Sequence, residues 1–353
     1  MIVYLIKRLT YGLLVLFGVV GVVFTLFTIL PGDAARMTQG QRSDVATMEA
    51  VRKEFGLDQP KTVQFVNYLS DLSPISTLAI DSETLAKYHF VKIASISDTR
   101  ILVLKKPYLR RSYQSKKEVT EILWNTIPNT GLLALAAMLF ATIVGIGLGV
   151  LAAIFKDTWV DKLAMSSAIL GISMPSFFAG ILIAWFFAFV LGDYTGLNLS
   201  GSLYDYDPFD GQILNLKNLI LPTITLGIRP LAIIVQLTRS SMLEVLSLDY
   251  IRTAKAKGLS SYAIIFNHAL RNALNPVVTA VSGWFASLMA GAFFVEYIFG
   301  WNGLGKVTVD ALELSDFPVV MGAVLFIAFL FVIINILVDM LYGFLDPRVK
   351  LNV

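Results

Sequence analysis

One polar stretch between two apolar segments decides how this chain is organised: Leu248-Asp-Tyr-Ile-Arg-Thr-Ala-Lys-Ala-Lys-Gly-Leu-Ser-Ser261, then His268-Ala-Leu-Arg-Asn-Ala-Leu-Asn-Pro276. The polar region around it, 240–275, is longer than a connection between two membrane helices requires and has room for two short helices. Its charged residues are mostly basic: Arg239 at its edge, Arg252, Lys255, Lys257 and Arg271, against Glu244 and Asp249. Such an excess is typical of cytoplasmic loops. We therefore interpret 240–275 as a structured cytoplasmic loop, where a soluble partner would act on a membrane protein.

The composition is that of a membrane protein. Of the 353 residues, 56% are hydrophobic and 15% charged, and the mean hydropathy is +0.72. Soluble domains are about 45–50% apolar and about 25% charged. The net charge of +3 has no basic stripe with interleaved aromatics, which argues against nucleic-acid binding. The chain has no cysteine, and His89 and His268 lack metal-ligand spacing, so we expect no metal site and no enzyme active site.

Six apolar windows are long enough to cross the hydrocarbon core as helices. They lie at 9–30, 129–154, 163–191, 219–239, 276–298 and 318–342. The first window is longer than a signal-peptide core and lacks an A-x-A cleavage site, so we expect a retained anchor. Lys and Arg in the short loops place both termini in the cytoplasm, because the outer loops 192–218 and 299–317 hold one lysine each.

This topology divides the chain into residues 1–30, a cytoplasmic tip and first span; 31–128, an extracytoplasmic domain; and 129–353, a core carrying the loop 240–275. In the outer domain, Ser43 begins a capped-helix pattern that Gly56 and Pro60 would end. The segment Phe90–Leu104 is rich in Ile and Val and predicts a short β element. A basic cluster overlaps its end: Lys105, Lys106, Arg110, Arg111, Lys116 and Lys117. It indicates a solvated surface or, less often, a docking site for a partner or lipid head groups.

The segment Gly300-Trp-Asn-Gly-Leu-Gly-Lys306 matches seven positions of the phosphate-binding loop G-x-x-x-x-G-K-[ST]. The eighth position is Val307, which has no hydroxyl group for magnesium, and the segment follows a membrane helix on the outer side. We therefore reject nucleotide binding and expect a turn of close-packed glycines. The run Gly145-Ile-Gly-Leu-Gly149 is likewise interpreted as close helix packing.

Ionisable residues in the apolar windows are candidate functional groups. Arg229 lies near the middle of the fourth window, where a charge is costly and should face a water-filled path or an acidic partner. Gly227 and Pro230 beside it suggest a locally broken helix, so Arg229 and Pro230 are candidates for a translocation path. The alternative is an arginine that snorkels or pairs with a neighbouring subunit. Glu296 and Asp339 lie near the interfaces and are interpreted as head-group-level or helix-pairing residues.

Within the polar loop, Asp249–Lys257 can form a short helix with an acidic start and a basic end, in agreement with the helix dipole. Gly258 suits the C-terminus of that helix. Thr253 and Ala254 are small, so we expect that a partner groove can approach the helix there. The alternative is a positively charged loop with no partner.

The loop and several other motifs together resemble the permease subunits of ABC importers in the dipeptide/oligopeptide/nickel family, most closely the first of the two permeases. The similar segments are Leu30-Pro-Gly-Asp-Ala-Ala35, Phe55-Gly-Leu-Asp-Gln-Pro60, Ile172-Ser-Met-Pro-Ser-Phe-Phe178, Leu237-Thr-Arg-Ser-Ser-Met-Leu243, Leu248–Ser260, Phe299-Gly-Trp-Asn-Gly-Leu-Gly305 and Leu345-Asp-Pro-Arg348. The general importer motif E-A-A-x3-G aligns with Arg252, Thr253, Ala254 and Gly258, with arginine in place of the acid. Residues from about 75 to 118 do not match and are interpreted as an insertion.

The resemblance implies an all-α membrane protein of the type I importer permease fold, with six membrane helices and a small α+β insertion between the first two. It implies a second homologous permease, two ATPase subunits that bind ATP and magnesium, and an extracytoplasmic binding protein, so that this chain binds no cofactor. The ATPase-coupling residues would be Asp249, Tyr250, Arg252, Thr253, Ala254, Lys255, Lys257 and Gly258. The protein would be a multi-pass component of the inner membrane.

Peptides are the cargo that the resemblance favours, with nickel chelates, glutathione or another small solute as alternatives. A self-sufficient secondary transporter is a second function class, but it would need paired ionisable groups near the midplane and internal repeats. Only Arg229 is deep in an apolar window. A membrane-anchored receptor is a third class, which six spans disfavour.

Overall fold

The computed structural model describes residues 2–29, 58–81, 87–209 and 211–345. The chain divides into two compact units, each described here by itself. Unit 1 comprises Met1–Arg8, Thr126–Val307 and Leu330–Val353, and unit 2 comprises Leu9–Asn125 and Thr308–Phe329. Four helices contribute to both units, because the boundaries fall inside them: α1 (Ile2–Ile29), α6 (Val119–Ile154), α14 (Leu304–Glu313) and α15 (Phe317–Leu345).

Among the described residues, four helices are long and apolar enough to cross a membrane: α1, α6, α10 (Lys217–Leu246) and α15. They confirm the helices predicted in the first, second, fourth and sixth apolar windows. A bent helix pair raises the number to five. The predicted span 276–298 consists instead of two helices, α12 (Arg271–Gly291) and α13 (Phe293–Ile298), which are not in this group. The count of six spans therefore stays a prediction.

The predicted span 163–191 is a bent helix pair in the structure, not one continuous helix. α7 (Trp159–Ser173) and α8 (Ser176–Ile183) meet at a 114° bend, and a π-helical stretch, Ala184–Val190, continues α8. Met174 between them is extended, with φ −77° and ψ 132°. Pro175 explains this conformation, because the proline ring disfavours a helical conformation in the residue before it. α9 (Gly192–Thr195) follows.

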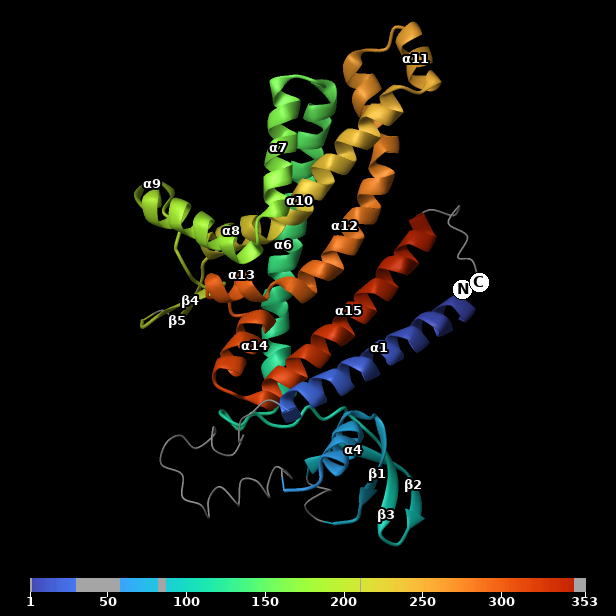
Figure 1. Cartoon of the computed structure of the whole chain (residues 1–353), viewed down its shortest axis with the longest axis vertical. Coiled ribbons are helices and arrows are strands. Elements are labelled where there is room, and N and C mark those ends of the chain that lie inside the picture. The colour runs from blue at the N-terminus through green and yellow to red at the C-terminus, as the bar shows by residue number, and fades with distance from the viewer. Residues whose placement is uncertain (1, 30–57, 82–86, 210, 346–353) are drawn as a thin grey trace. The chain divides into compact units, whose positions relative to one another are not determined.

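α10 is the central helix of unit 1 and packs against α7, α8 and α12 (Figure 1). Two glycines of α6 let it approach closely. A Cβ atom on Gly145 would lie 2.9 Å from Ile234 Cγ2, and one on Gly149 would lie 2.5 Å from Thr238 Cβ. The predicted packing role of this glycine run is therefore confirmed for Gly145 and Gly149, whereas Gly147 has no such neighbour within 4 Å.

Two ion pairs join helices of unit 1. Arg239 of α10 donates two hydrogen bonds to the carboxylate of Asp161 in α7, with N–O distances of 2.5 and 2.7 Å. Asp161 also accepts a 3.0 Å hydrogen bond from the N–H group of Asp157, so a mostly buried charge has several donors, as such a charge requires. Arg8 of α1 lies 2.8 Å from Asp339 of α15, which confirms the helix-pairing interpretation of Asp339.

Unit 2 contains a small α+β element. It consists of α4 (Lys61–Leu72) and an antiparallel sheet in the order β1-β3-β2, formed by β1 (Ile75–Ala79), β2 (Phe90–Ser97) and β3 (Arg100–Lys105). The β element predicted in 90–104 is confirmed and is a hairpin of two strands. Leu78, Ile101 and Val103 form the buried side of the sheet. The helix predicted from Ser43 to Gly56 lies outside the described residues.

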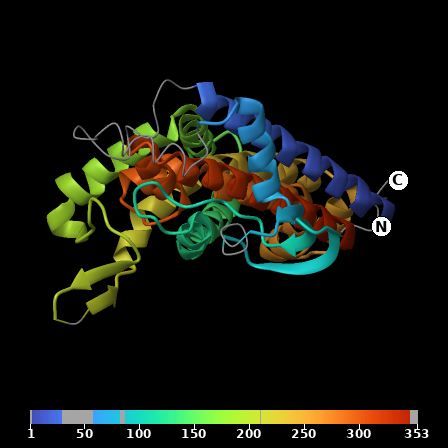
Figure 2. The same ribbon diagram turned by 90° about the horizontal axis from the view of Figure 1, so that it is seen from below.

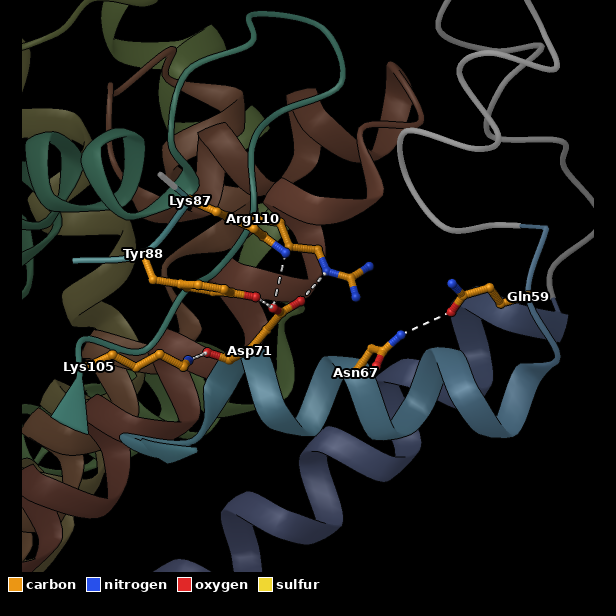
Figure 3. Close-up of polar contacts among 7 residues, drawn as sticks. All are labelled: Gln59, Asn67, Asp71, Lys87, Tyr88, Lys105 and Arg110. Atoms are coloured by element: carbon orange, nitrogen blue, oxygen red, sulfur yellow. Dashed lines mark hydrogen bonds and ion pairs between the residues drawn. The ribbon is translucent and has the colours of Figure 1, made fainter. Parts of the chain in front are cut away.

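A buried carboxylate organises this element (Figure 3). Asp71 Oδ1 accepts hydrogen bonds from the Tyr88 hydroxyl at 2.5 Å and from Lys87 Nζ at 3.3 Å, and Oδ2 accepts one from Arg110 Nε at 3.1 Å. The Asp71 backbone carbonyl accepts a 2.6 Å hydrogen bond from Lys105 Nζ. Burial raises the pKa of the Tyr88 hydroxyl and lowers the pKa of the Lys105 ammonium group.

The six residues of the basic cluster that begins at Lys105 therefore fall into two groups. Lys105 is buried and Arg110 is partly buried against Asp71, which corrects the prediction of a solvated surface for these two residues. The other four members are exposed, as predicted: Lys106, Arg111, Lys116 and Lys117.

Candidate functional site

The polar loop contains the short helix that the sequence predicts, α11 (Asp249–Ala256). The helix ends where Gly258 takes φ 73°, a left-handed conformation that favours glycine. Leu259 N–H donates to the Ala254 carbonyl, and Gly258 N–H donates to the Lys255 carbonyl. These two bonds form a Schellman motif, which confirms Gly258 as the C-terminal residue of the turn.

Most of the remaining loop residues are also helical. α10 extends to Leu246, and a π-helical stretch, Ala263–Leu270, leads directly into α12. Figure 1 shows α11 at the end of unit 1 where α10 and α12 meet the loop, far along both helices from α13. Of the two short helices for which 240–275 has room, α11 is a separate helix, whereas the second helical stretch is continuous with α12.

One face of α11 packs on a small apolar core, here called the loop-end cluster. Its buried members come from α6, α10, α11, the π-helical stretch and α12: Val150, Ala153, Met242, Val245, Ile251, Ala254, Ile264, Ala269 and Ala273. Ile251 is fully buried and Ala254 is 7% exposed, because residues three apart share one helix face. The methyl group of Ala254 thus faces the chain's own core, and its predicted contact with a partner stays a prediction.

The other predicted coupling residues are on the outer side: Asp249, Tyr250, Arg252, Thr253, Lys255, Lys257 and Gly258 are all exposed. Arg252 Nη1 lies 3.2 Å from Asp249 Oδ1, in a pair whose side chains are mostly in solvent. Such a pair contributes about 0–1 kcal/mol, so it leaves Arg252 available for another partner. The outer face of α11 is therefore basic and unobstructed by the described residues.

Tyr250 fastens α11 to the start of α12. Its hydroxyl group accepts a 2.8 Å hydrogen bond from Asn272 Nδ2 and donates a 3.3 Å hydrogen bond to the His268 carbonyl. Together with the buried side chain of Ile251, these bonds hold α11 against both α10 and α12. These contacts connect α11 to two long helices that pack on each other.

Three exposed apolar residues beside α11 are absent from the predicted site. Leu248, Leu259 and Tyr262 are 45%, 41% and 69% exposed next to the basic residues of the helix. Exposed apolar side chains rimmed by polar ones are typical of protein interfaces. In the sequence they are ordinary apolar residues of a loop, and only the orientation of α11 separates them from the buried ones.

Arg229 and Pro230 are consecutive but do not form one surface. Arg229 is exposed, whereas Pro230 is buried. α10 continues through both of them, which corrects the predicted break. Gly227 serves packing instead, because a Cβ atom there would lie 2.8 Å from the Phe140 ring. Arg229 is about 25 Å along α10 from the end that meets the loop, so it is separate from the α11 surface.

The phosphate-loop-like segment holds an internal carboxylate. Glu296 of α13 is fully buried, and its Oε1 accepts a 2.7 Å hydrogen bond from the Thr130 hydroxyl group. Its Oε2 accepts hydrogen bonds from Gly305 N–H at 2.6 Å and Lys306 N–H at 3.2 Å. These N–H groups belong to the first turn of α14, where unpaired donors and the helix dipole favour a negative charge. Glu296 therefore takes the place that a phosphate would need.

The glycines of this segment make room for the carboxylate. A Cβ atom on Gly305 would lie 2.9 Å from Glu296 Oε2. Trp301 is fully buried, and its Nε1–H group donates a 3.0 Å hydrogen bond to the carbonyl of Asn129 in α6. Asn129 Nδ2 donates in turn to the Asn302 carbonyl at 2.7 Å. The predicted turn of close-packed glycines is confirmed, and it is fixed to α6.

No metal centre is assigned within the part of the chain that the structure describes, where no three His, Cys, Asp or Glu residues form a metal-binding group. His268 takes part in the loop through its backbone carbonyl. His89 belongs to unit 2 and precedes β2.

Two protein-family models match this chain. The model described as "Binding-protein-dependent transport system inner membrane component" matches residues 145–351, which include α11. The model for the N-terminal part of such membrane components matches residues 1–84. The two models thus match both ends of the chain.

Curated relatives cover nearly the whole chain. The dipeptide transport system permease protein of Alkalihalophilus pseudofirmus is 34% identical over 364 residues, covering 99% of this chain and 100% of its own. A protein of Brucella abortus named as a peptide transport system permease is 38% identical, with 98% of each chain covered. The glutathione transport system permease protein of Escherichia coli is 34% identical, with 99% of each covered. Among solved structures, an inward-facing MetNI methionine ABC transporter matches at 15% identity and a TM-score of 0.47, covering 64% of this chain and 97% of its own.

Proposed function

The chain belongs to the family of binding-protein-dependent transport system inner membrane components, and from this premise we propose that it is the permease subunit of an ATP-driven peptide importer. It is a multi-pass inner-membrane protein and a transport subunit, which distinguishes it from an enzyme. In the proposed complex, a second, homologous permease completes the pathway. Two ATPase subunits hold ATP and magnesium, and an extracytoplasmic binding protein delivers the cargo.

The coupling role is supported by the position of α11, which has one exposed basic face and one face packed on the ends of two long helices. Its outer face presents Arg252, Lys255 and Lys257 to solvent, while Ile251 and Tyr250 fix it to the ends of α10 and α12. A groove on an ATPase subunit that grips this outer face would move both long helices as the ATPase dimer closes. In this proposal the loop 240–275 and both termini face the cytoplasm, in agreement with the distribution of Lys and Arg.

The names of the relatives support a peptide cargo. Dipeptides, peptides and glutathione all carry peptide-type amide bonds and a free carboxylate, so one pathway chemistry suits all three. Glutathione is therefore the second candidate cargo. We propose that Arg229, exposed on α10, lies on the pathway and attracts the cargo carboxylate, whereas the buried Pro230 does not contact cargo.

Co-purification and uptake test this function. The chain should purify with ATPase subunits, and vesicles that contain the whole complex should accumulate a labelled dipeptide only with ATP and the binding protein. A panel of dipeptides, glutathione and a nickel chelate would identify the cargo class. Uptake driven by an ion gradient through this chain alone would overturn the proposal in favour of a secondary transporter.

A further inference from the structure

A β-hairpin of unit 1 carries unusually exposed aromatic side chains. β4 (Tyr204–Asp207) and β5 (Gly211–Leu214) pair only with each other, and both figures of the whole chain show them extending away from the helices of unit 1 (Figure 2). Tyr206 is 79% exposed, and Phe209 at the turn is 96% exposed. Large aromatic side chains so placed lose the favourable burial that normally stabilises them.

Both tyrosines of β4 lie on one side of the hairpin. Tyr204 pairs with Leu214 across the strands, and Tyr206 follows two residues later, so these three side chains share a face. None of them is buried by the described residues of unit 1. Because an isolated two-stranded hairpin is marginally stable in water, this apolar face is suited to a partner that covers it.

The base of the hairpin is nevertheless joined by hydrogen bonds to the helices of unit 1. Asn218 of α10 is buried, and its Nδ2 donates a 2.9 Å hydrogen bond to Asp205 Oδ1. Asn215 Nδ2 donates to the other oxygen of Asp205 at 2.7 Å. Gly201 N–H, just before the hairpin, donates to the Phe299 carbonyl at 2.8 Å. These hydrogen bonds fix the position of the aromatic tip relative to the helices of unit 1, so the hairpin loses less conformational entropy when a partner docks.

The negative charge of the segment that contains the hairpin indicates which kind of partner covers its apolar face. Residues 192–218 contain four aspartates, Asp193, Asp205, Asp207 and Asp210, and one lysine, Lys217. The Asp205 carboxylate accepts its side-chain hydrogen bonds from the neutral amides of Asn215 and Asn218, which do not cancel its negative charge. An acidic segment is repelled by anionic lipid head groups and attracted by a basic protein surface.

We propose that the β4–β5 hairpin is a docking element for the substrate-binding protein, with Tyr206 and Phe209 entering an apolar pocket that has a basic rim. The inference rests on the proposed function, because it requires the hairpin to face the extracytoplasmic side. Aromatic residues in such pockets are frequent hot spots of binding energy. The hairpin would thus decide which binding proteins this permease accepts.

Docking of the labelled binding protein to the whole importer in lipid nanodiscs tests the inference. The double variant Tyr206→Ala/Phe209→Ala should raise the Kd at least about tenfold and reduce binding-protein-stimulated ATP hydrolysis, with basal hydrolysis unchanged. Tyr194→Ala is the matched control, because Tyr194 is 88% exposed on α9 but lies outside the hairpin. It should leave the Kd unchanged.

A variant that changes only charge separates electrostatic attraction during association from the direct contacts of the bound hairpin. Asp207 Oδ1 accepts a 2.8 Å hydrogen bond from Phe209 N–H, which Asp207→Asn retains while removing the charge. This variant should slow association about two- to fivefold at low salt, and the difference should vanish at high salt.

Two results would count against the inference, and a third against the function on which it rests. An unchanged Kd in the double variant, while the wild-type complex responds to the binding protein, would exclude the hairpin as the docking element. If brominated lipids quenched the tryptophan fluorescence of a Phe209→Trp variant without the binding protein, the hairpin would contact the bilayer instead of the binding protein. Failure of the wild-type complex to respond to the binding protein would instead overturn the proposed function itself.

Discussion

The Thr130 hydroxyl group donates a 2.7 Å hydrogen bond to Glu296 Oε1 and accepts a 2.8 Å hydrogen bond from Leu304 N–H. One side chain of α6 therefore connects α13 with the first turn of α14, over sequence separations of 166 and 174 residues. The contact is buried, so each donor and acceptor in it depends on the others.

Thr130→Val should destabilise the permease by about 1–3 kcal/mol, because it leaves buried polar groups of Glu296 and Leu304 without their partner. Thermal unfolding of the purified complex in detergent measures the loss. Thr279→Val is the matched control, since Thr279 is exposed on α12 and its hydroxyl group donates to the Asn275 carbonyl of its own helix. Equal melting temperatures for the two variants would contradict the connecting role.

Substitution of Gly258 should separate coupling from folding. Gly258→Asn tolerates the left-handed conformation, so it should retain uptake. Gly258→Gln and Gly258→Glu share the same backbone strain, but only the glutamate adds a negative charge to the basic outer face of α11. We expect Glu to abolish ATP-dependent uptake while membrane insertion stays normal, with Gln intermediate. Normal coupled uptake by Gly258→Glu would exclude this face as the ATPase contact.

The Asp161–Arg239 pair should stabilise the packing of α7 against α10. Asp161→Asn removes the negative charge and one of the two oxygens that accept hydrogen bonds from Arg239. We expect a loss of about 1–3 kcal/mol, below the value for a fully buried pair because Arg239 is partly exposed. A double-mutant cycle with Arg239→Gln measures the coupling. Additive losses in the two single variants would mean that the residues do not interact.

Arg229→Ala should lower peptide uptake about tenfold or more without loss of assembly, because the side chain is exposed on α10 and not part of its packing. Arg229→Lys keeps the charge and should retain more activity. Lys217→Ala, at the start of the same helix, is the control for a general effect of charge. Unchanged transport and assembly in Arg229→Ala would remove this residue from the pathway.

Unit 2 should lose stability at alkaline pH. Burial and the hydrogen bond to Asp71 raise the pKa of Tyr88 above its ordinary value of 10.0, so the unfolded chain ionises first. The folded state then holds more protons, and its stability falls as pH rises above about 10. Lys105 acts in the opposite direction, because its pKa is lowered, so the comparison must be between variants. Tyr88→Phe should make the alkaline loss shallower, whereas Tyr194→Phe should not; thermal unfolding across this pH range measures both.

The sequence predicts the local features of the loop well. The acidic start of α11, its basic end and the Gly258 turn all follow from interactions within a few residues, and the structure has each of them. Pro175 also carried a signal for the bend after α7, but the apolar run around it favoured a single span. Local chemistry and hydrophobic periodicity conflict there, and the backbone restriction before proline decides the result.

Tertiary contacts set the remaining features, which the sequence could not indicate. Ala254 and Thr253 are both small neighbours in α11, and only packing against the loop-end cluster buries the first and exposes the second. Lys105 belongs to a run of basic residues, yet it is buried against the backbone of Asp71, 34 residues earlier. Such choices depend on partners far along the chain.

The carboxyl group of Glu296 explains in physical terms why Gly300–Lys306 resembles a phosphate-binding loop without binding a nucleotide. A loop of glycines that leads into a helix is a general way to concentrate backbone donors around one negative charge, whatever carries that charge. In nucleotide-binding loops the phosphate group arrives from solution and leaves again, whereas here the carboxyl group is covalently part of the chain and stays. The same backbone arrangement thus forms a permanent contact within the chain. A search for nucleotide sites in membrane proteins should first ask whether a nearby acidic side chain already accepts hydrogen bonds from the backbone N–H groups.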